Sequence, residues 1–385
     1  MKIALIGPVY PYRGGIAHYT TFLAQRLREK HNVLMISYRR QYPRWLFPGH
    51  SDRDPSEHSI QLEDVHYLLD AFSVQSWFRT LNLLKLYEPD LLLTQWWTPF
   101  WAPSLITILA RFRSVFPEVP IFTICHNIVS HEEHWWDNLV ARLVLRLPDH
   151  CIVHSESSKI YLLYILPTAK VTLIGFPQYE GLISVFYSRA DARNKLGIQA
   201  NESVLLFFGF VRPYKGLEYL LHALAKVNHV LSVRLLIVGE FWHDKQNYLR
   251  LIDDLGIGDY VTIVDEYVPN EEIGLYFAAA DVLVLPYIKT SQSAVVQLAF
   301  ETGTPVIASN VSGVGEYVVE GVNGLLVMPG DIEDLAQAIT RYFQNNLATA
   351  FRQSMPNLKC DRWKMLIEKI EELSNVERTI KNTQL

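Results

Sequence analysis

The feature that most restricts the fold of this 385-residue sequence is an alternation of short apolar runs with longer amphipathic stretches. Each apolar run has the length and composition of a buried strand, and between the runs apolar residues recur at helical spacing. Near-continuous apolar strands separated by helices are typical of parallel sheets that are covered on both faces. The expected strands are Ile3–Ile6, Val33–Ile36, Leu91–Thr94, Ile121–Ile124, Cys151–His154, Val171–Ile174, Val204–Phe208, Arg234–Val238, Val261–Val264, Val282–Leu285, Pro305–Ala308 and Gly324–Val327.

The number of strands and the length of the chain predict two α/β domains, each doubly wound and Rossmann-like, that face a central cleft. The pattern is interrupted around Gly175–Ser188. We therefore expect an N-terminal domain over residues 1–180 and a C-terminal domain over residues 181–360. Residues 361–385 are expected to form a helix over Asp361–Leu373 that packs back on the first domain, followed by a frayed polar tail.

Charge and cysteine content restrict the class of partner. Residues 1–180 carry 17 Lys and Arg against 16 Asp and Glu, whereas residues 181–385 carry 18 against 24. An acidic second half argues against nucleic acid as the main ligand. The three cysteines show no metal or disulfide spacing, the chain begins with a strand, and no apolar run approaches the ~20 residues of a membrane span. These features predict a cytoplasmic protein, either soluble or peripheral on the inner face of a membrane.

The stretch from Phe207 to Gly216, FFGFVRPYKG, predicts an anion site. A buried strand ends at Gly209, two cations (Arg212 and Lys215) follow, and Gly216 opens a helical pattern. A helix N-terminus presents unpaired N–H groups and the positive end of a dipole, to which the two side chains add full charges. Two solvated surface charges are the alternative explanation.

Two further helix starts could approach a phosphate. The pair Gly14–Gly15 follows the first strand, although it is not the dinucleotide fingerprint and could serve only as a turn. In Thr290–Ser309 a polar loop leads into a helix from about Ser293, so its backbone amides are available to an anion. The candidate ligand-binding residues there are Ser291, Gln292, Ser293, Ala294 and Val295.

His126 follows the fourth expected strand and is a candidate for hydrogen bonding a hydroxyl or for acid–base work. A satisfied structural histidine is the competing interpretation. The nearby His131, Glu132 and His134 match no spacing of helical metal ligands, so we expect a polar loop there and no metal site.

Aromatic residues gather at expected strand ends, in Trp96–Trp101 and at Trp135 and Trp136. They could stack on sugars or meet a membrane interface, but core packing explains part of them. The segment Tyr38–Phe47 interleaves Arg39, Arg40 and Arg44 with aromatic residues, which suits an anionic membrane surface. A solvated loop is the alternative.

Taken in this order, the segments resemble a retaining glycosyltransferase of family four (group 1) with the GT-B fold, from Met1 to about Leu373. The similarity is densest in the second half: it comprises GFVRPYKG, VGE (Val238–Glu240), Tyr267–Tyr287, QSAVVQLAFETGTPVIAS and Gly313–Asp331. The resemblance implies a nucleotide-sugar donor, UDP- or GDP-linked, held by the C-terminal domain, and a glycan or lipid-linked acceptor on the N-terminal one. It also implies transfer with retention, no metal ion and no cofactor beyond the donor substrate.

The resemblance assigns roles to individual residues. Lys215 falls on the family's diphosphate-binding lysine, and Gly14 and Gly15 match its phosphate-facing glycine loop. His126 matches the position that meets the transferred sugar, and the amides of Ser293, Ala294 and Val295 match the loop that caps the phosphates. The family's arginine directly follows the glycine, where this chain has Phe210, so Arg212 is the expected substitute.

The sequence departs from the family at two glutamates that usually contact the donor sugar and the ribose. Those positions hold Thr290 and Leu298, so the chain resembles the branch of the family that lacks the pair. Glu301, one helical turn after Leu298, is a candidate for the ribose contact. Two alternatives remain open at this point: a nucleotide-sugar epimerase of the same fold, which needs no acceptor, and a non-catalytic protein that binds a nucleotide sugar.

Overall fold

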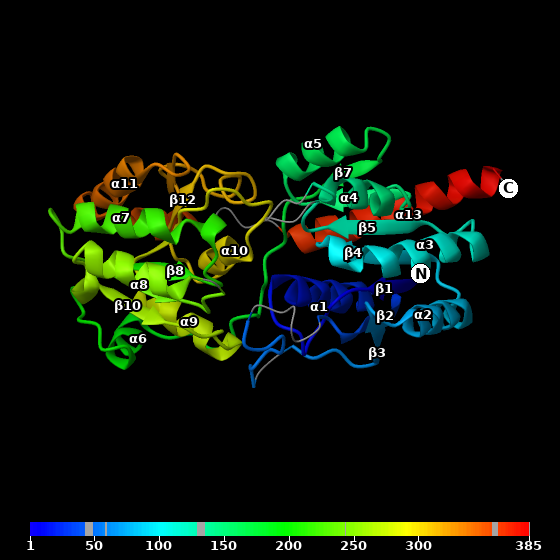
Figure 1. Cartoon of the computed structure of the whole chain (residues 1–385), viewed down its shortest axis with the longest axis horizontal. Coiled ribbons are helices and arrows are strands. Elements are labelled where there is room, and N and C mark those ends of the chain that lie inside the picture. The colour runs from blue at the N-terminus through cyan, green and yellow to red at the C-terminus, as the bar shows by residue number, and fades with distance from the viewer. Residues whose placement is uncertain (43–48, 58–59, 129–134, 243, 356–360, 385) are drawn as a thin grey trace.

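The computed structural model describes residues 1–42, 49–57, 60–128, 135–242, 244–355 and 361–384. Two α/β bodies lie side by side, each built on one sheet with helices on both faces (Figure 1). All the strand pairs in both sheets are parallel, as the near-continuous apolar runs predict. The expected fold class is therefore confirmed.

The first sheet has seven strands in the order β3-β2-β1-β4-β5-β6-β7. Its central strand β4 is buried over its whole length, so apolar side chains are needed on both faces. Sequence reasoning missed β3, an edge strand whose residues are mostly exposed or half-buried. The strands are β1 Lys2–Ile6, β2 Asn32–Arg40, β3 Val65–Asp70, β4 Leu91–Trp96, β5 Ile121–Cys125, β6 His150–Val153 and β7 Val171–Leu173.

Helices cover both faces of this sheet. Most core residues of α1 pack in one apolar cluster with those of the C-terminal helix α13. The core residues of α2, α3, α4 and α5 pack in another. The helices are α1 Gly15–Arg28, α2 Val74–Tyr87, α3 Ala102–Val115, α4 Asp137–Leu145, α5 Glu156–Ile165 and α13 Arg362–Gln384, with a short 3₁₀ helix η1 at Pro99–Trp101.

The second sheet has six strands in the order β10-β9-β8-β11-β12-β13. In both sheets the strand order reverses beside the first strand of the domain, which is where ligands bind in doubly wound folds. The strands are β8 Ser203–Phe208, β9 Val233–Val238, β10 Val261–Val264, β11 Val282–Leu285, β12 Val306–Ser309 and β13 Gly324–Val327.

The helices of the second domain divide in the same way. The core residues of α7, α8, α11 and α12 lie in one cluster, and those of α9 and α10 lie in another that continues into the first domain. The helices are α6 Arg189–Lys195, α7 Leu217–Val227, α8 Lys245–Asp254, α9 Asn270–Ala279, α10 Ala294–Glu301, α11 Ile332–Gln344 and α12 Leu347–Ser354, with 3₁₀ helices η2 Pro213–Lys215 and η3 Gly258–Tyr260.

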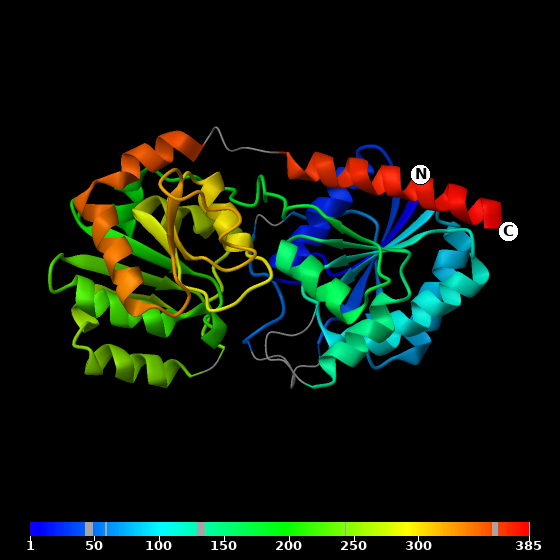
Figure 2. The same ribbon diagram turned by 90° about the horizontal axis from the view of Figure 1, so that it is seen from above.

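The C-terminal helix α13 lies along the first domain, far from the sheet that precedes it in sequence (Figure 2). Trp363 stacks near Tyr19, with 5.2 Å between the ring centroids. The expectation of a frayed tail after Leu373 is wrong, because the helix continues to Gln384. Ion pairs hold this last part on the first domain: Arg378 Nη2 lies 3.0 Å from Asp90 and Lys381 Nζ lies 2.9 Å from Asp149.

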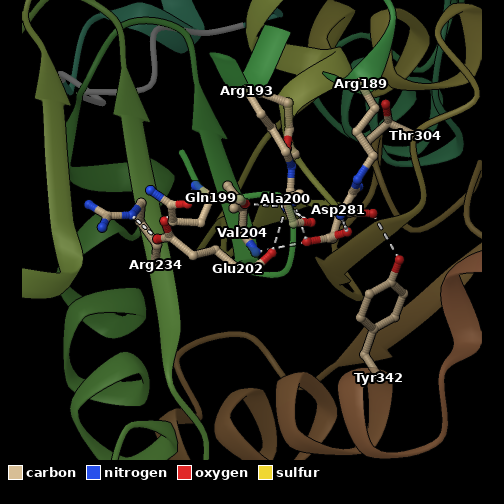
Figure 3. Close-up of polar contacts among 12 residues, drawn as sticks. Arg189, Arg193, Gln199, Ala200, Glu202, Val204, Arg234, Asp281, Thr304 and Tyr342 are labelled. Carbon is tan, nitrogen blue, oxygen red and sulfur yellow. Dashed lines mark hydrogen bonds and ion pairs between the residues drawn. The ribbon is translucent and has the colours of Figure 1, made fainter. Parts of the chain in front are cut away.

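A buried arginine fixes one end of the second domain. Arg193, with 2 % of its surface exposed, pairs with Asp281 at 3.0 Å and donates to the carbonyl oxygens of Ala279, Gln199, Ala200 and Glu202 (Figure 3). A buried guanidinium needs partners of this kind, because its donors cannot be left without acceptors. The network ties α6 to the start of β8.

None of the helices in the described part of the chain combines the length and the apolar character of a membrane span.

Candidate active site

A cavity of about 230 Å³ lies where the two domains meet. The N-terminal domain contributes Gly14, Gly15 and His18, and the segment between the domains contributes Tyr179 and Leu182. The remaining lining comes from the ends of the C-terminal strands and the helix starts that follow them. The cavity therefore sits where the doubly wound fold predicts a ligand.

Lys215 is the cation of this cavity. Its side chain lines the wall and the residue is only 8 % exposed. Burial, and secondarily the charge of Arg212, lowers the pKa of Lys215 from 10.5 to about 7. Among the described residues Lys215 has no carboxylate partner in an ion pair, so its charge is available to an anion in the cavity.

Two glycines allow the lysine to lie there. Gly216 adopts φ +70° directly after the 3₁₀ turn η2, and a Cβ at that position would lie 1.9 Å from the carbonyl oxygen of Pro286. Gly209 has φ +96°, and a Cβ there would lie 3.0 Å from Lys215 Nζ. The glycines that flank the turn thus set the backbone path and leave room for the ammonium group.

Two helix N-termini, one from each domain, also face the cavity. Helix α1 begins after Gly14, and helix α10 begins after Ser293, and in neither case does a side chain cap the first amides. Gly15, Ala294 and Val295 line the wall. Uncapped amides and the helix dipole both favour an anion at these ends. The structure thus brings Gly14, Gly15, Lys215, Gln292, Ser293, Ala294 and Val295 together as the sequence suggests.

His126 lies at the end of β5, outside the cavity lining, and is 1 % exposed. Its Nε2 is 2.6 Å from Gln95 Oε1, and its Nδ1 is 2.9 Å from Gln292 Nε2 on the other domain. Burial, with a smaller effect of His154, holds the pKa of His126 well below its usual range. The imidazole is therefore neutral at physiological pH, and both of its nitrogens are already engaged.

Like His126, three more residues were expected at the ligand but do not line this cavity: Arg212, Ser291 and Glu301. The Arg212 guanidinium lies 5.1 Å from the ring centroid of Trp242 and acts on the cavity through its effect on Lys215. Ser291 Oγ donates to the carbonyl oxygen of His126 at 3.1 Å. Glu301 is the last residue of α10, at the opposite end of the helix from the uncapped amides. Its Oε1 accepts a hydrogen bond from the Gly181 amide at 3.0 Å.

Sequence reasoning missed an ion pair that joins the two domains beside the cavity. Arg13 Nη2 lies 2.5 Å from Glu240 Oε2, with side-chain exposures of 5 % and 1 %. The guanidinium also lies 5.2 Å from the ring centroid of Phe210 and 5.0 Å from that of Tyr267. In the sequence, Glu240 stands two residues after the strand end at Val238, and Arg13 stands directly before the glycine pair Gly14–Gly15.

The aromatic clusters divide into two kinds. Trp96, Trp97 and Trp101 are buried, at most 7 % exposed, so they serve the core of the first domain. Trp135 and Trp136 are exposed by 86 % and 43 %. Two sets of residues lie outside the described ranges. They are His131, Glu132 and His134, where we expect no metal site, and Arg44, Trp45 and Phe47 of the arginine-rich segment. Within the described ranges no cluster of three His, Cys, Asp or Glu residues is arranged to hold a metal ion.

Comparison with known proteins identifies the two halves separately. The family model for glycosyltransferase family 4 matches residues 13–175, and the model for glycosyl transferases group 1 matches residues 202–345. An uncharacterised glycosyltransferase of Methanocaldococcus jannaschii is 26 % identical over 89 % of this chain and 88 % of its own length. The D-inositol 3-phosphate glycosyltransferase of Mycolicibacterium smegmatis is 32 % identical over 46 % of this chain, and the match spans 41 % of that relative.

Solved structures agree on the architecture. The sucrose-phosphate synthase of Thermosynechococcus elongatus superposes with a TM-score of 0.71 at 24 % identity, over 97 % of this chain and 98 % of its own. HepE of Anabaena, in complex with UDP and glucose, gives a TM-score of 0.73 at 22 % identity, over 97 % and 100 %. With a family 4 domain followed by a group 1 domain on a two-sheet GT-B fold, the chain is a glycosyltransferase.

Proposed function

We propose that the protein transfers a hexose-like sugar from a nucleotide-diphosphate donor to a hydroxyl of a glycan or lipid-linked saccharide, with retention of configuration and without a bound metal ion, in polysaccharide biosynthesis. The observation that carries the proposal is Lys215, a buried lysine without a carboxylate partner among the described residues, in a cavity that also receives two uncapped helix starts. The UDP and UDP-glucose bound to HepE of Anabaena favour a UDP-linked donor, with GDP as the alternative base.

The charges of the cavity suit the chemistry of such a transfer. The bond between the anomeric carbon and the phosphate oxygen breaks, and the nucleoside diphosphate leaves with negative charge. Lys215 and the amides at the starts of α1 and α10 stabilise that charge as it develops, the part a metal ion plays in other enzymes. The acceptor oxygen bonds to the anomeric carbon on the same face, and its proton passes to an oxygen of the leaving phosphate. His126, neutral and held at both nitrogens, acts on the sugar in this scheme only through its partner Gln292, which lines the cavity.

A thermal-shift panel tests the donor class. UDP, GDP and ADP, each with a corresponding nucleotide sugar, are added to the protein, since a ligand that binds only the folded state raises its stability by about 2.7 kcal/mol at a hundred times Kd. We expect one base to stand out. No shift with any nucleotide would overturn the proposal. The selected donor, incubated alone and then with a membrane saccharide extract, separates a transferase from an epimerase, which needs no acceptor.

Lys215→Ala should reduce transfer from that donor on the order of a hundredfold, as expected for loss of one electrostatic donor to the developing charge. The matched control is Lys226→Ala, an exposed lysine on α7 whose side chain is 54 % exposed. Equal turnover of the Lys215 variant and the parent would contradict the assignment of the diphosphate to this cavity.

We also propose that the end of β2 meets an anionic membrane surface on the cytoplasmic side. Arg39 and Arg40 are exposed there, and Phe72, 59 % exposed, lies beside Arg40 at 5.9 Å. Arginine next to exposed aromatic residues suits a negatively charged interface. Changing Arg39, Arg40 and Arg44 together to Ser should lower co-flotation with phosphatidylserine vesicles, whereas a triple Ser variant of the same charge at Lys226, Arg250 and Arg341 should not. Equal flotation of both variants would refute this.

A further inference from the structure

The hydrogen bonds around His126 fix which of its nitrogens carries the proton. Gln292 Nε2, 2.9 Å from Nδ1, is an NH2 nitrogen that can only donate, so Nδ1 accepts. Nε2 then carries the hydrogen and donates to Gln95 Oε1 at 2.6 Å. The low pKa of the buried imidazole agrees with a neutral ring that has one donor and one acceptor. His126 therefore presents a fixed lone pair to Gln292.

This contact orients the carboxamide of Gln292 through its Nε2 atom, and the Oε1 atom takes no part in it. Gln292 lines the cavity between Thr290 and Ser293, beside the amides that start α10. Among the described residues its Oε1 is buried without a hydrogen-bond partner. An unmet buried acceptor is unfavourable, so a hydroxyl group at this place would be bound.

The backbone on either side of Gln292 is held in place. Thr290 Oγ1 donates to the carbonyl oxygen of Gln292 at 2.8 Å, and Ser291 Oγ donates to the carbonyl oxygen of His126 at 3.1 Å. Gly313 packs so closely on this loop that a Cβ there would lie 2.4 Å from the Ser291 carbonyl. The side chain thus projects from a rigid loop, as a residue that selects a ligand must.

We propose that Gln292, oriented by His126, reads a hydroxyl of the transferred sugar by accepting its hydrogen on Oε1. The acceptor that the family's glutamate supplies is absent at Thr290, and the carboxamide two residues later takes its place. Because Gln292 and His126 belong to different domains, His126 can orient the Gln292 side chain only when the domains are closed. This inference rests on the proposed function, since it requires a nucleotide-sugar donor in the cavity. His126 acts here as a positioning residue.

The test compares affinities for a nucleoside diphosphate and its sugar by isothermal titration calorimetry. UDP with UDP-glucose, UDP-galactose or UDP-N-acetylglucosamine, and GDP with GDP-mannose, are titrated into the parent protein, and the tightest-binding sugar is kept. Gln292→Met, which removes both polar atoms at similar volume, should weaken binding of that sugar nucleotide about five- to tenfold and leave the diphosphate unchanged. Gln246→Met, an exposed glutamine of α8, is the control and should change neither.

His126→Phe keeps the ring and removes the lone pair, so it should produce part of the same selective loss, and it carries the test if Gln292→Met does not fold. If the folded variant binds the diphosphate and the sugar nucleotide with the same ratio of affinities as the parent, the inference is overturned while the proposed function stands. Failure of the parent protein to bind any of these nucleotides would instead overturn the proposed function, and the inference with it.

Discussion

Lys215→Met should stabilise the folded protein at neutral and acidic pH, although the substitution removes the cation of the site. In the unfolded chain a lysine titrates near 10.4, whereas burial lowers the pKa of Lys215 to about 7 in the folded protein. The unfolded state therefore binds more protons between about pH 7 and pH 10, so stability rises with pH in this window. Below pH 7 both states are protonated, and the cost of burying the ammonium group is then fully present.

The size of this cost follows from the two pKa values. Each unit of difference corresponds to about 1.4 kcal/mol, so the buried charge destabilises the fold by about 3 to 5 kcal/mol below pH 7 and by about 1 kcal/mol at pH 9.5. For domains of roughly this size 1 kcal/mol moves the melting temperature by about 2–4 °C. The variant should therefore melt roughly 10 °C above the parent at pH 6.5, and the gap should narrow steadily toward pH 9.5.

Differential scanning calorimetry of both proteins at intervals from pH 6 to pH 10, without nucleotide, measures this gap. Lys226→Met on the exposed face of α7 is the matched control and should follow the parent at every pH. Parallel melting curves for Lys215→Met and the parent over the whole range would refute the reasoning, since they would show that Lys215 does not lose its proton more readily when folded.

Three further substitutions test the framework around the site. Arg13→Met leaves Glu240 buried without its cationic partner and should cost about 3–5 kcal/mol. Small-angle X-ray scattering should show a larger radius of gyration as the domains separate, and an unchanged radius would contradict a role of the Arg13–Glu240 ion pair in holding the domains together. Gly216→Ala forces a Cβ against a backbone carbonyl and should cost about 3 kcal/mol or more in urea unfolding, against little change for Gly258→Ala, where the space is open. Arg193→Met should lower the stability by about 3–5 kcal/mol without a change in nucleotide affinity, as measured by calorimetry; weaker binding would show that the network reaches the cavity.

The fold could be predicted from the sequence because its strands are buried on both faces and need continuous apolar runs. β3 was not predicted, because it is an edge strand. Its residues from Val65 to Asp70 are largely exposed or half-buried, so the sequence there shows no continuous apolar run. The helix after Leu373 was not predicted, because Arg378 and Lys381 pair with Asp90 and Asp149 on the first domain. The spacing of polar residues in the sequence does not indicate such distant partners.

The candidate site was predictable where it depends on local geometry. Lys215 and the start of α10 each come at the end of a short loop after a strand, so a strand–loop–helix pattern is sufficient to find them. The pairs Arg13–Glu240 and His126–Gln292 join residues more than 150 positions apart, and only the closed arrangement of the domains brings them together. Glu301 does not line the cavity, because it lies at the C-terminal end of α10, whereas the cavity lies at the N-terminal end of this helix.

The position of α13 has a consequence for biosynthesis on the ribosome. Trp363, Leu366 and Ile370 belong to the same apolar cluster as Tyr19 and Phe22 of α1. This apolar cluster of the first domain therefore includes residues that are synthesised only after every strand of the second domain. A nascent chain halted before residue 361 would leave the apolar face of α1 that α13 covers exposed to chaperones.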